Sequence, residues 1–142
     1  MKKTVSLLLA CVILLQLPAP GAFAATESNA FITEYGAELY SPSSDVIQVD
    51  FYLYGTDYMS SLGASMIYLY EDGALLATFS RYNPIYTSVM TTTNSYRFLG
   101  SISYPAKAGS TYYAIVSFYA TNSSGTGTEG CTTNNYTIPA SP

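Results

Sequence analysis

VIQVDFYLY, residues 46–54, is the stretch that decides the fold class. Apolar residues occupy every second position from Ile47 onward, and polar or aromatic residues lie between them. Successive side chains of a β-strand point to opposite faces, so this period of two predicts a half-buried strand. The set expected to face a core is Ile47, Val49, Phe51 and Leu53. The set expected to face outward is Gln48, Asp50, Tyr52 and Tyr54.

Other extended segments lie on both sides of this one, and turn-forming residues separate them. The expected strands cover residues 31–40, 46–54, 64–71, 75–80, 95–104, 111–121 and 128–138. Residues 55–63 are expected to form a connection, and residues 81–94 a polar loop with at most a short edge strand. Asp72-Gly73 predicts a tight hairpin turn, because this pair readily adopts the positive φ angles of a two-residue loop.

Seven short strands joined by turns predict an all-β domain. The expected architecture is a two-sheet antiparallel sandwich of the immunoglobulin or fibronectin type III kind, and a closed barrel is the alternative. Tyr112 opens the strand expected at residues 111–121, directly after the turn-forming Ala108-Gly109-Ser110. A tyrosine at this place in immunoglobulin-like domains bonds through its hydroxyl to the preceding loop. Tyr112 is therefore the candidate for a structural tyrosine corner.

A set of turn glycines and core residues between residues 36 and 130 carries a resemblance to a known family. The set is Gly55-Thr56, Met59, Gly63-Ala64-Ser65, Ile67, Tyr70-Glu71, Gly100, Tyr104, Ala108-Gly109, Tyr112-Tyr113-Ala114-Ile115-Val116 and Phe118-Tyr119-Ala120. In these residues the chain resembles a family of short secreted proteins of Gram-positive bacteria, which has no known function and an immunoglobulin-like domain. The resemblance implies the sandwich fold, and it brings no catalytic residues with it.

Residues 1–24 have the order of a secretory signal peptide. Two lysines open the chain, an uncharged apolar segment follows at residues 4–17, and prolines and an A-x-A site end the segment. The apolar run is shorter than the roughly 20 residues of a spanning helix. We expect cleavage after Ala24, secretion, and no transmembrane anchor after processing, with a single domain at residues 25–142. The residues before Cys11 superficially match a lipoprotein box, but the apolar segment continues past it.

Charge and cysteine content limit the partners of the processed chain. Three basic residues oppose nine acidic ones after residue 24, which gives a net charge of −6. Such a chain repels phosphate backbones and anionic lipids, so nucleic acid is not an expected partner. Cys131 is the one cysteine after residue 24, so an intramolecular disulfide is excluded. We expect it to be a buried small hydrophobe, or else a spare thiol open to an intermolecular disulfide.

The inventory of catalytic groups is small. The chain contains no histidine, so serine or cysteine nucleophiles activated by histidine, and zinc sites that use imidazole, are excluded. Carboxylates remain, but glycosidase chemistry with paired carboxylates needs a walled cleft that a small sandwich rarely provides. We expect no enzyme activity, no cofactor and no metal. Calcium held by Glu71 and Asp72 is the alternative.

Tyrosine is the most suggestive residue type, and all 15 tyrosines follow residue 24. Strand parity turns Tyr68 and Tyr70 outward on one strand, and Tyr113 and Tyr119 outward on another. If the two strands are neighbours, the four rings form one exposed surface that suits a protein partner or a sugar ring. The same rings can instead serve only to stabilise the sheet through cross-strand pairs.

The sequence thus predicts a secreted, non-enzymatic binding or interaction module of an adhesion-like kind. Its partner would be an extracellular protein or a glycan. The alternative is a small carbohydrate-binding module that uses the exposed tyrosine surface.

Overall fold

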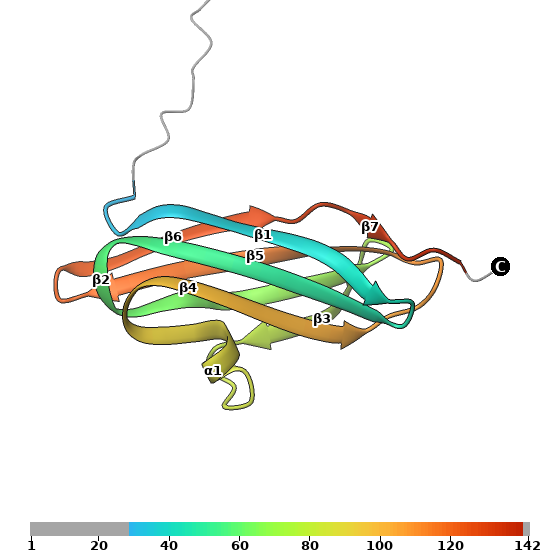
Figure 1. Ribbon diagram of the computed structural model, residues 1–142, viewed down its shortest axis with the longest axis horizontal. Coiled ribbons are helices and arrows are strands. Elements are labelled where there is room, and N and C mark those ends of the chain that lie inside the picture. Colours follow the sequence, from blue (N-terminus) through green and yellow to red (C-terminus); the bar gives the residue numbers. More distant parts are fainter. Residues whose placement is uncertain (1–28, 141–142) are drawn as a thin grey trace, which may run out of the picture.

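The computed structural model describes residues 29–140, which form one antiparallel β-sheet that curls around an apolar core (Figure 1). The strands are β1 (Ile32–Ser43), β2 (Val46–Glu71), β3 (Ala74–Ser80), β4 (Thr91–Pro105), β5 (Thr111–Asn122), β6 (Gly125–Thr132) and β7 (Tyr136–Thr137). One short helix, α1 (Thr87–Met90), precedes β4. The prediction of an all-β, antiparallel chain with seven strands is confirmed for these residues. The predicted signal peptide and its cleavage after Ala24 lie outside them.

β2 is the strand on which the sheet is built. Its first half, residues 46–54, pairs with β1 on one side and with β4 on the other. Its second half pairs with β3 and with β5. β6 and β7 pair with β5. Because β2 has partners along both of its halves, the backbone hydrogen bonds join all seven strands into one sheet.

The predicted connection at residues 55–63 is wrong, because β2 runs through it. The register between β2 and β4 shifts between Tyr54 and Met59, and this shift absorbs the irregular residues without ending the strand. Gly63 is required here for two reasons. Its φ is +150°, and a Cβ at this position would collide with the backbone carbonyl of Met90. Gly63 therefore marks a close approach of two backbone segments.

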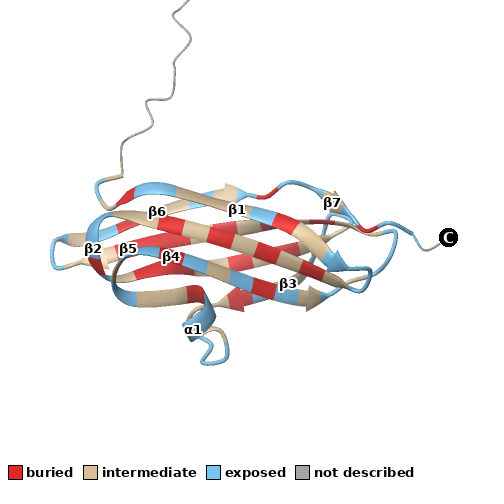
Figure 2. Ribbon diagram, in the orientation of Figure 1, coloured by how far each residue is buried: buried red, intermediate tan, exposed pale blue. Residues whose placement is uncertain are grey.

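The core lies on the inward face of the curled sheet. The alternation predicted for residues 46–54 is confirmed, and Figure 2 shows buried residues recurring along β2. The four predicted inward residues are at most 2% exposed; they are Ile47, Val49, Phe51 and Leu53. β3 and β5 add buried side chains such as Phe79, Val116 and Phe118. Burial of such side chains stabilises the fold by roughly 1.5–3 kcal/mol each.

The turns and the last strand differ in detail from expectation. The Asp72-Gly73 hairpin is confirmed, with φ of +49° and +83° at these two residues. The predicted polar loop at residues 81–94 contains turns and α1, and β4 already begins at Thr91. The last strand, predicted at residues 128–138, is divided into β6 and β7.

Side-chain amides join the facing edges of β1 and β6. The Asn134 amide, between β6 and β7, donates a hydrogen bond to the Leu39 carbonyl at 2.9 Å and accepts one from the Leu39 N–H at 3.0 Å. At the other end Asn29 donates to the Thr128 carbonyl at 3.1 Å. These contacts imitate the pairing of a strand, although no backbone ladder connects β1 to β6 within residues 29–140. A barrel closed by backbone hydrogen bonds is therefore not formed by this part of the chain.

Candidate functional site

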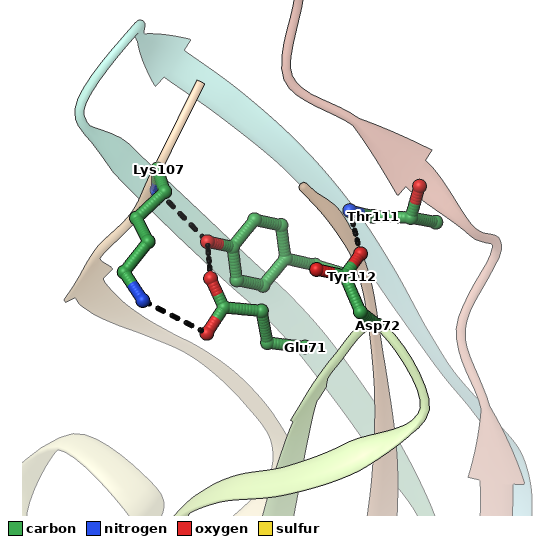
Figure 3. A network of polar contacts seen from close by, with 5 residues as sticks. All are labelled: Glu71, Asp72, Lys107, Thr111 and Tyr112. Carbon is green, nitrogen blue, oxygen red and sulfur yellow. Dashed lines mark hydrogen bonds and ion pairs between the residues drawn. The ribbon is translucent and has the colours of Figure 1, made fainter. Parts of the chain in front are cut away.

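The hydroxyl of Tyr112 ties the loop before β5 to the end of β2 (Figure 3). Tyr112 is fully buried. Its oxygen accepts a hydrogen bond from the Lys107 backbone N–H and donates one to Glu71 Oε1, both at 2.8 Å. The Lys107 Nζ lies 3.7 Å from Glu71 Oε2. Burial raises the pKa of Tyr112 above its usual value of 10.0, and the Glu71 carboxylate raises it further.

Glu71 and Asp72, the residues of the alternative calcium prediction, take part in polar contacts around Tyr112. Glu71 bonds to Tyr112 and lies beside Lys107, while Asp72 Oδ1 accepts the Thr111 backbone N–H at 2.9 Å. Residues 29–140 contain no cluster of three or more histidine, cysteine or acidic side chains arranged to hold a metal ion. Glu71 and Asp72 therefore act in this structure as links between the β2–β3 hairpin and the loop that precedes β5.

Three of the four predicted surface tyrosines lie together on neighbouring strands. Tyr70 on β2 and Tyr113 on β5 are cross-strand partners, and their rings stack with centroids 4.6 Å apart and planes 3° from parallel. Tyr68 lies two residues along β2, opposite Ile115. All three tyrosines are partly exposed. The structure thus brings together Tyr68, Tyr70 and Tyr113 as one group, here called the tyrosine surface.

Tyr119 does not belong to that surface, and the prediction of an exposed ring is wrong at this position. Tyr119 is only 4% exposed. The Arg81 guanidinium carbon lies 3.6 Å from the centre of its ring, and its hydroxyl is 2.6 Å from Ser61 Oγ. It also lies six residues beyond Tyr113, about 20 Å along an extended strand. Parity turned the ring to the predicted face, but Arg81 covers it there.

Cys131 is a free cysteine on β6, opposite Val116, and it is partly buried against the core. Burial raises the pKa of its thiol above the usual value of 9.0. A thiol that keeps its proton is a weak nucleophile, so the environment of Cys131 favours a packing role.

A trough crosses the outward face of β1, the first half of β2 and β4, with a volume of about 640 Å³. Two rows of cross-strand partners define it. The first row is Gly36, Tyr52 and Leu99, and the second row is Glu38, Asp50 and Ser101. The volume falls within the range of roughly 300–1,000 Å³ that is usual for ligand pockets.

The first row forms the apolar end of the trough. A Cβ at position 36 would lie 2.7 Å from Cε1 of Tyr52 and 2.9 Å from its hydroxyl oxygen, so the ring leans across β1 and uses the space that glycine leaves free. Burial raises the pKa of Tyr52 above 10.0, and the charge of Glu34 adds to the effect. Leu99 is 66% exposed on the other side of the row. The end thus presents an aromatic ring and an exposed aliphatic side chain to one space.

The second row forms the acidic end, and Gln48 orders part of it. The Gln48 side-chain nitrogen donates to Asp50 Oδ1 at 2.8 Å and to the Tyr40 hydroxyl at 2.6 Å. Glu38 lies directly opposite Asp50 in the register of β1 and β2. Like charges placed opposite one another destabilise a sheet. The ion pair found within residues 29–140 joins Lys107 to Glu71, and the lining of the trough contains no basic side chain to compensate Glu38 and Asp50.

Sequence reasoning placed Gln48, Asp50 and Tyr52 on the outward face but did not identify a site there. The missing information was the register, because the hairpin register decides that Glu38 lies opposite Asp50, and Leu99 comes from a strand far from residue 50 in the sequence. One signal was present: Gly36 interrupts a segment expected to be a strand, and an isolated glycine in a strand often marks a close approach. Comparisons with known protein families, with curated proteins and with solved structures found no match to this chain.

Proposed function

We propose that this protein is a secreted, non-enzymatic binding module and that its ligand site is the trough on β1, β2 and β4. The observation that carries the proposal is the acidic end of the trough, where Glu38 and Asp50 lie opposite each other without a basic partner. Residues that only stabilise a sheet face are expected to form opposite-charge or apolar pairs instead. An uncompensated pair beside an exposed apolar end is typical of a surface shaped for binding.

Secretion is proposed from the order of residues 1–24, with cleavage after Ala24. Within residues 29–140 there is no helix with the length and apolar character needed to cross a membrane. A non-enzymatic role is proposed because the chain contains no histidine and because the trough is open to solvent instead of forming a walled cleft.

We also propose that the fold is a variant of the immunoglobulin-like sandwich. The strand neighbours support this relation. The first half of β2 lies between β1 and β4, and the second half lies between β3 and β5, as the second and third strands do in the two sheets of that fold. The hydroxyl of Tyr112, which reaches back to Lys107, supports a tyrosine corner. The resemblance to secreted proteins of Gram-positive bacteria stays part of this proposal.

The tyrosine surface is the second candidate for a binding site, with a protein as its partner. Its rings, however, already satisfy each other: the stack of Tyr70 on Tyr113 is an intramolecular contact that stabilises the β2–β5 pair by roughly 0.2–1 kcal/mol. Glu38 and Asp50 in the trough have no basic partner within residues 29–140, and the trough is therefore the better candidate.

A fragment screen tests the proposed function without assuming a ligand. Amide NMR spectra of the ¹⁵N-labelled protein would be recorded with neutral, cationic, anionic and polyhydroxylated fragments. We expect hits whose shifts map to the backbone around Gly36, Asp50 and Ser101. Hits confined to the region of Tyr70 and Tyr113, or none at all, would contradict the assignment of the site.

A further inference from the structure

The trough has the dimensions of a site for one or two small rings. Its two rows are two residues apart, which is about 7 Å along the strands, and its three strands span about 10 Å. The apolar end holds Tyr52 and Leu99, and the acidic end holds Glu38, Asp50 and Ser101. A complementary ligand therefore has an apolar face and a polar rim within a short distance of each other.

The acidic end offers mainly acceptors of hydrogen bonds. Ionised carboxylates accept and do not donate. Gln48 directs its side-chain nitrogen to Asp50 and Tyr40, so its amide donors are already used within the sheet. Ser101 is exposed, and its hydroxyl can donate or accept. The matching ligand is rich in donors.

The charge of the lining excludes one class of ligand. The lining contains Glu38 and Asp50 and no basic side chain, so an anionic ligand would be repelled. Hydroxyl groups that donate to carboxylates form short, charge-assisted hydrogen bonds, about twice as strong as neutral ones. The aliphatic face of a pyranose ring packs against an aromatic or aliphatic side chain, which Tyr52 and Leu99 supply.

We propose that the ligand of the trough is a non-acidic saccharide. One ring packs its apolar face against Tyr52 and Leu99, and its hydroxyl groups donate to Glu38 and Asp50. This inference rests on the proposed function, since it names the ligand class of the same site. It moves the carbohydrate site expected from the sequence away from the tyrosine surface.

Calorimetry and NMR titration of the purified protein would test the ligand class. The probes are neutral oligosaccharides (cello-, xylo- and mannohexaose), chitosan hexamer as an amino sugar, oligogalacturonate as an acidic sugar, and a lysine-rich peptide. We expect binding of at least one neutral or amino sugar, with shifts around residues 36, 50 and 101, and no binding of oligogalacturonate. Preferential binding of the acidic sugar, or of the peptide with no sugar bound, overturns the inference.

Variants then locate the contact. Leu99→Ala and Glu38→Gln change exposed side chains, and we expect the affinity for the bound sugar to fall at least tenfold when both are combined. The matched control is Leu75→Ala, since Leu75 is a 54% exposed leucine on β3, outside the trough. Its affinity should equal that of the wild type. Equal affinity of the double variant and the wild type overturns the inference.

The two proposals fail in different ways. If fragments of another class bind in the trough while every sugar fails, the saccharide inference is wrong and the binding function stands. If neither fragments nor sugars bind there, both are wrong.

Discussion

Replacing Tyr112 with phenylalanine removes one oxygen atom and keeps the buried ring. In the native protein that oxygen accepts the Lys107 N–H and donates to Glu71 Oε1, each at 2.8 Å. The variant therefore loses both hydrogen bonds of the hydroxyl group, while the packing of the ring against the core is preserved. The change isolates the contribution of the hydroxyl group.

The two hydrogen bonds differ in strength. The bond to the Glu71 carboxylate has a charged acceptor, for which the net contribution is about 1.5–3 kcal/mol. The Lys107 N–H lies on an exposed loop residue, so water replaces the lost acceptor and the cost is smaller. We expect Tyr112→Phe to reduce the free energy of unfolding by about 2 kcal/mol. For a domain of this size that corresponds to a fall in Tm of about 8 °C.

Urea unfolding followed by far-UV circular dichroism and tyrosine fluorescence measures this loss, since the chain has no tryptophan. Tyr113→Phe is the matched control. Tyr113 is the next residue on the same strand, and its hydroxyl makes no hydrogen bond within residues 29–140. Its free energy of unfolding should change by less than about 0.5 kcal/mol. If both variants lose the same stability, or neither loses any, the Tyr112 hydroxyl does not hold the loop.

Three further results are expected. Gly63→Ala should destabilise the fold by more than about 2 kcal/mol, because the new Cβ collides with backbone atoms and the backbone has a strained φ angle. The control is Gly109→Ala, where φ is +84° but the space is open, and this variant should lose about 1 kcal/mol of stability. Equal urea midpoints of the two variants would contradict the steric argument. Asn134→Ala removes both hydrogen bonds to the Leu39 backbone and should lower the free energy of unfolding by about 1–2 kcal/mol. It should also accelerate hydrogen exchange of the Leu39 amide, and an unchanged exchange rate would show that the bridge made by Asn134 is unimportant. Stability should be constant from neutral pH to about pH 9 and fall above it, because the Cys131 thiol and four phenols, whose pKa values are raised by burial, hold their protons more tightly in the folded than in the unfolded chain. These phenols are Tyr35, Tyr40, Tyr52 and Tyr112. A urea midpoint that stays constant through pH 11.5 would contradict this result.

Local pattern was sufficient to predict the parts of the fold that depend on neighbouring residues. The alternation in residues 46–54 determines which side chains are buried, and Asp72-Gly73 determines its own turn. The same local rules failed at residues 55–63, where a connection was predicted. Backbone pairing with β4 and β5 keeps this segment extended, and no pattern within the segment itself reveals partners that follow it by dozens of residues.

The candidate site shows the same division. Parity correctly turned Tyr52 and Asp50 outward, and it also turned Tyr119 to the face where its ring lies. The alternation of side chains along a strand does not determine whether another segment covers an outward-facing residue. Arg81, from the segment after β3, covers Tyr119, while Glu38 and Leu99 from two other strands complete the trough. The positions of Arg81 and Leu99 depend on contacts between segments that are far apart in the sequence, and that of Glu38 depends on the register of the β1–β2 hairpin.

The continuity of β2 also bears on how the chain folds. β1 and β3 can pair with it as hairpins, but its second half has no partner on one side until residues 112–121 are available. Pairings this distant in sequence require closure of long loops first, so folding is expected on the order of milliseconds to seconds. A chain that stops before β5 leaves β2 with a long unpaired edge, and the buried residues Ile67 and Leu69 without their cross-strand partners Val116 and Ala114. Such an edge is a template for self-association. The domain should therefore fold as a single cooperative unit, and pairing of β5 with β2 is the step that completes the sheet.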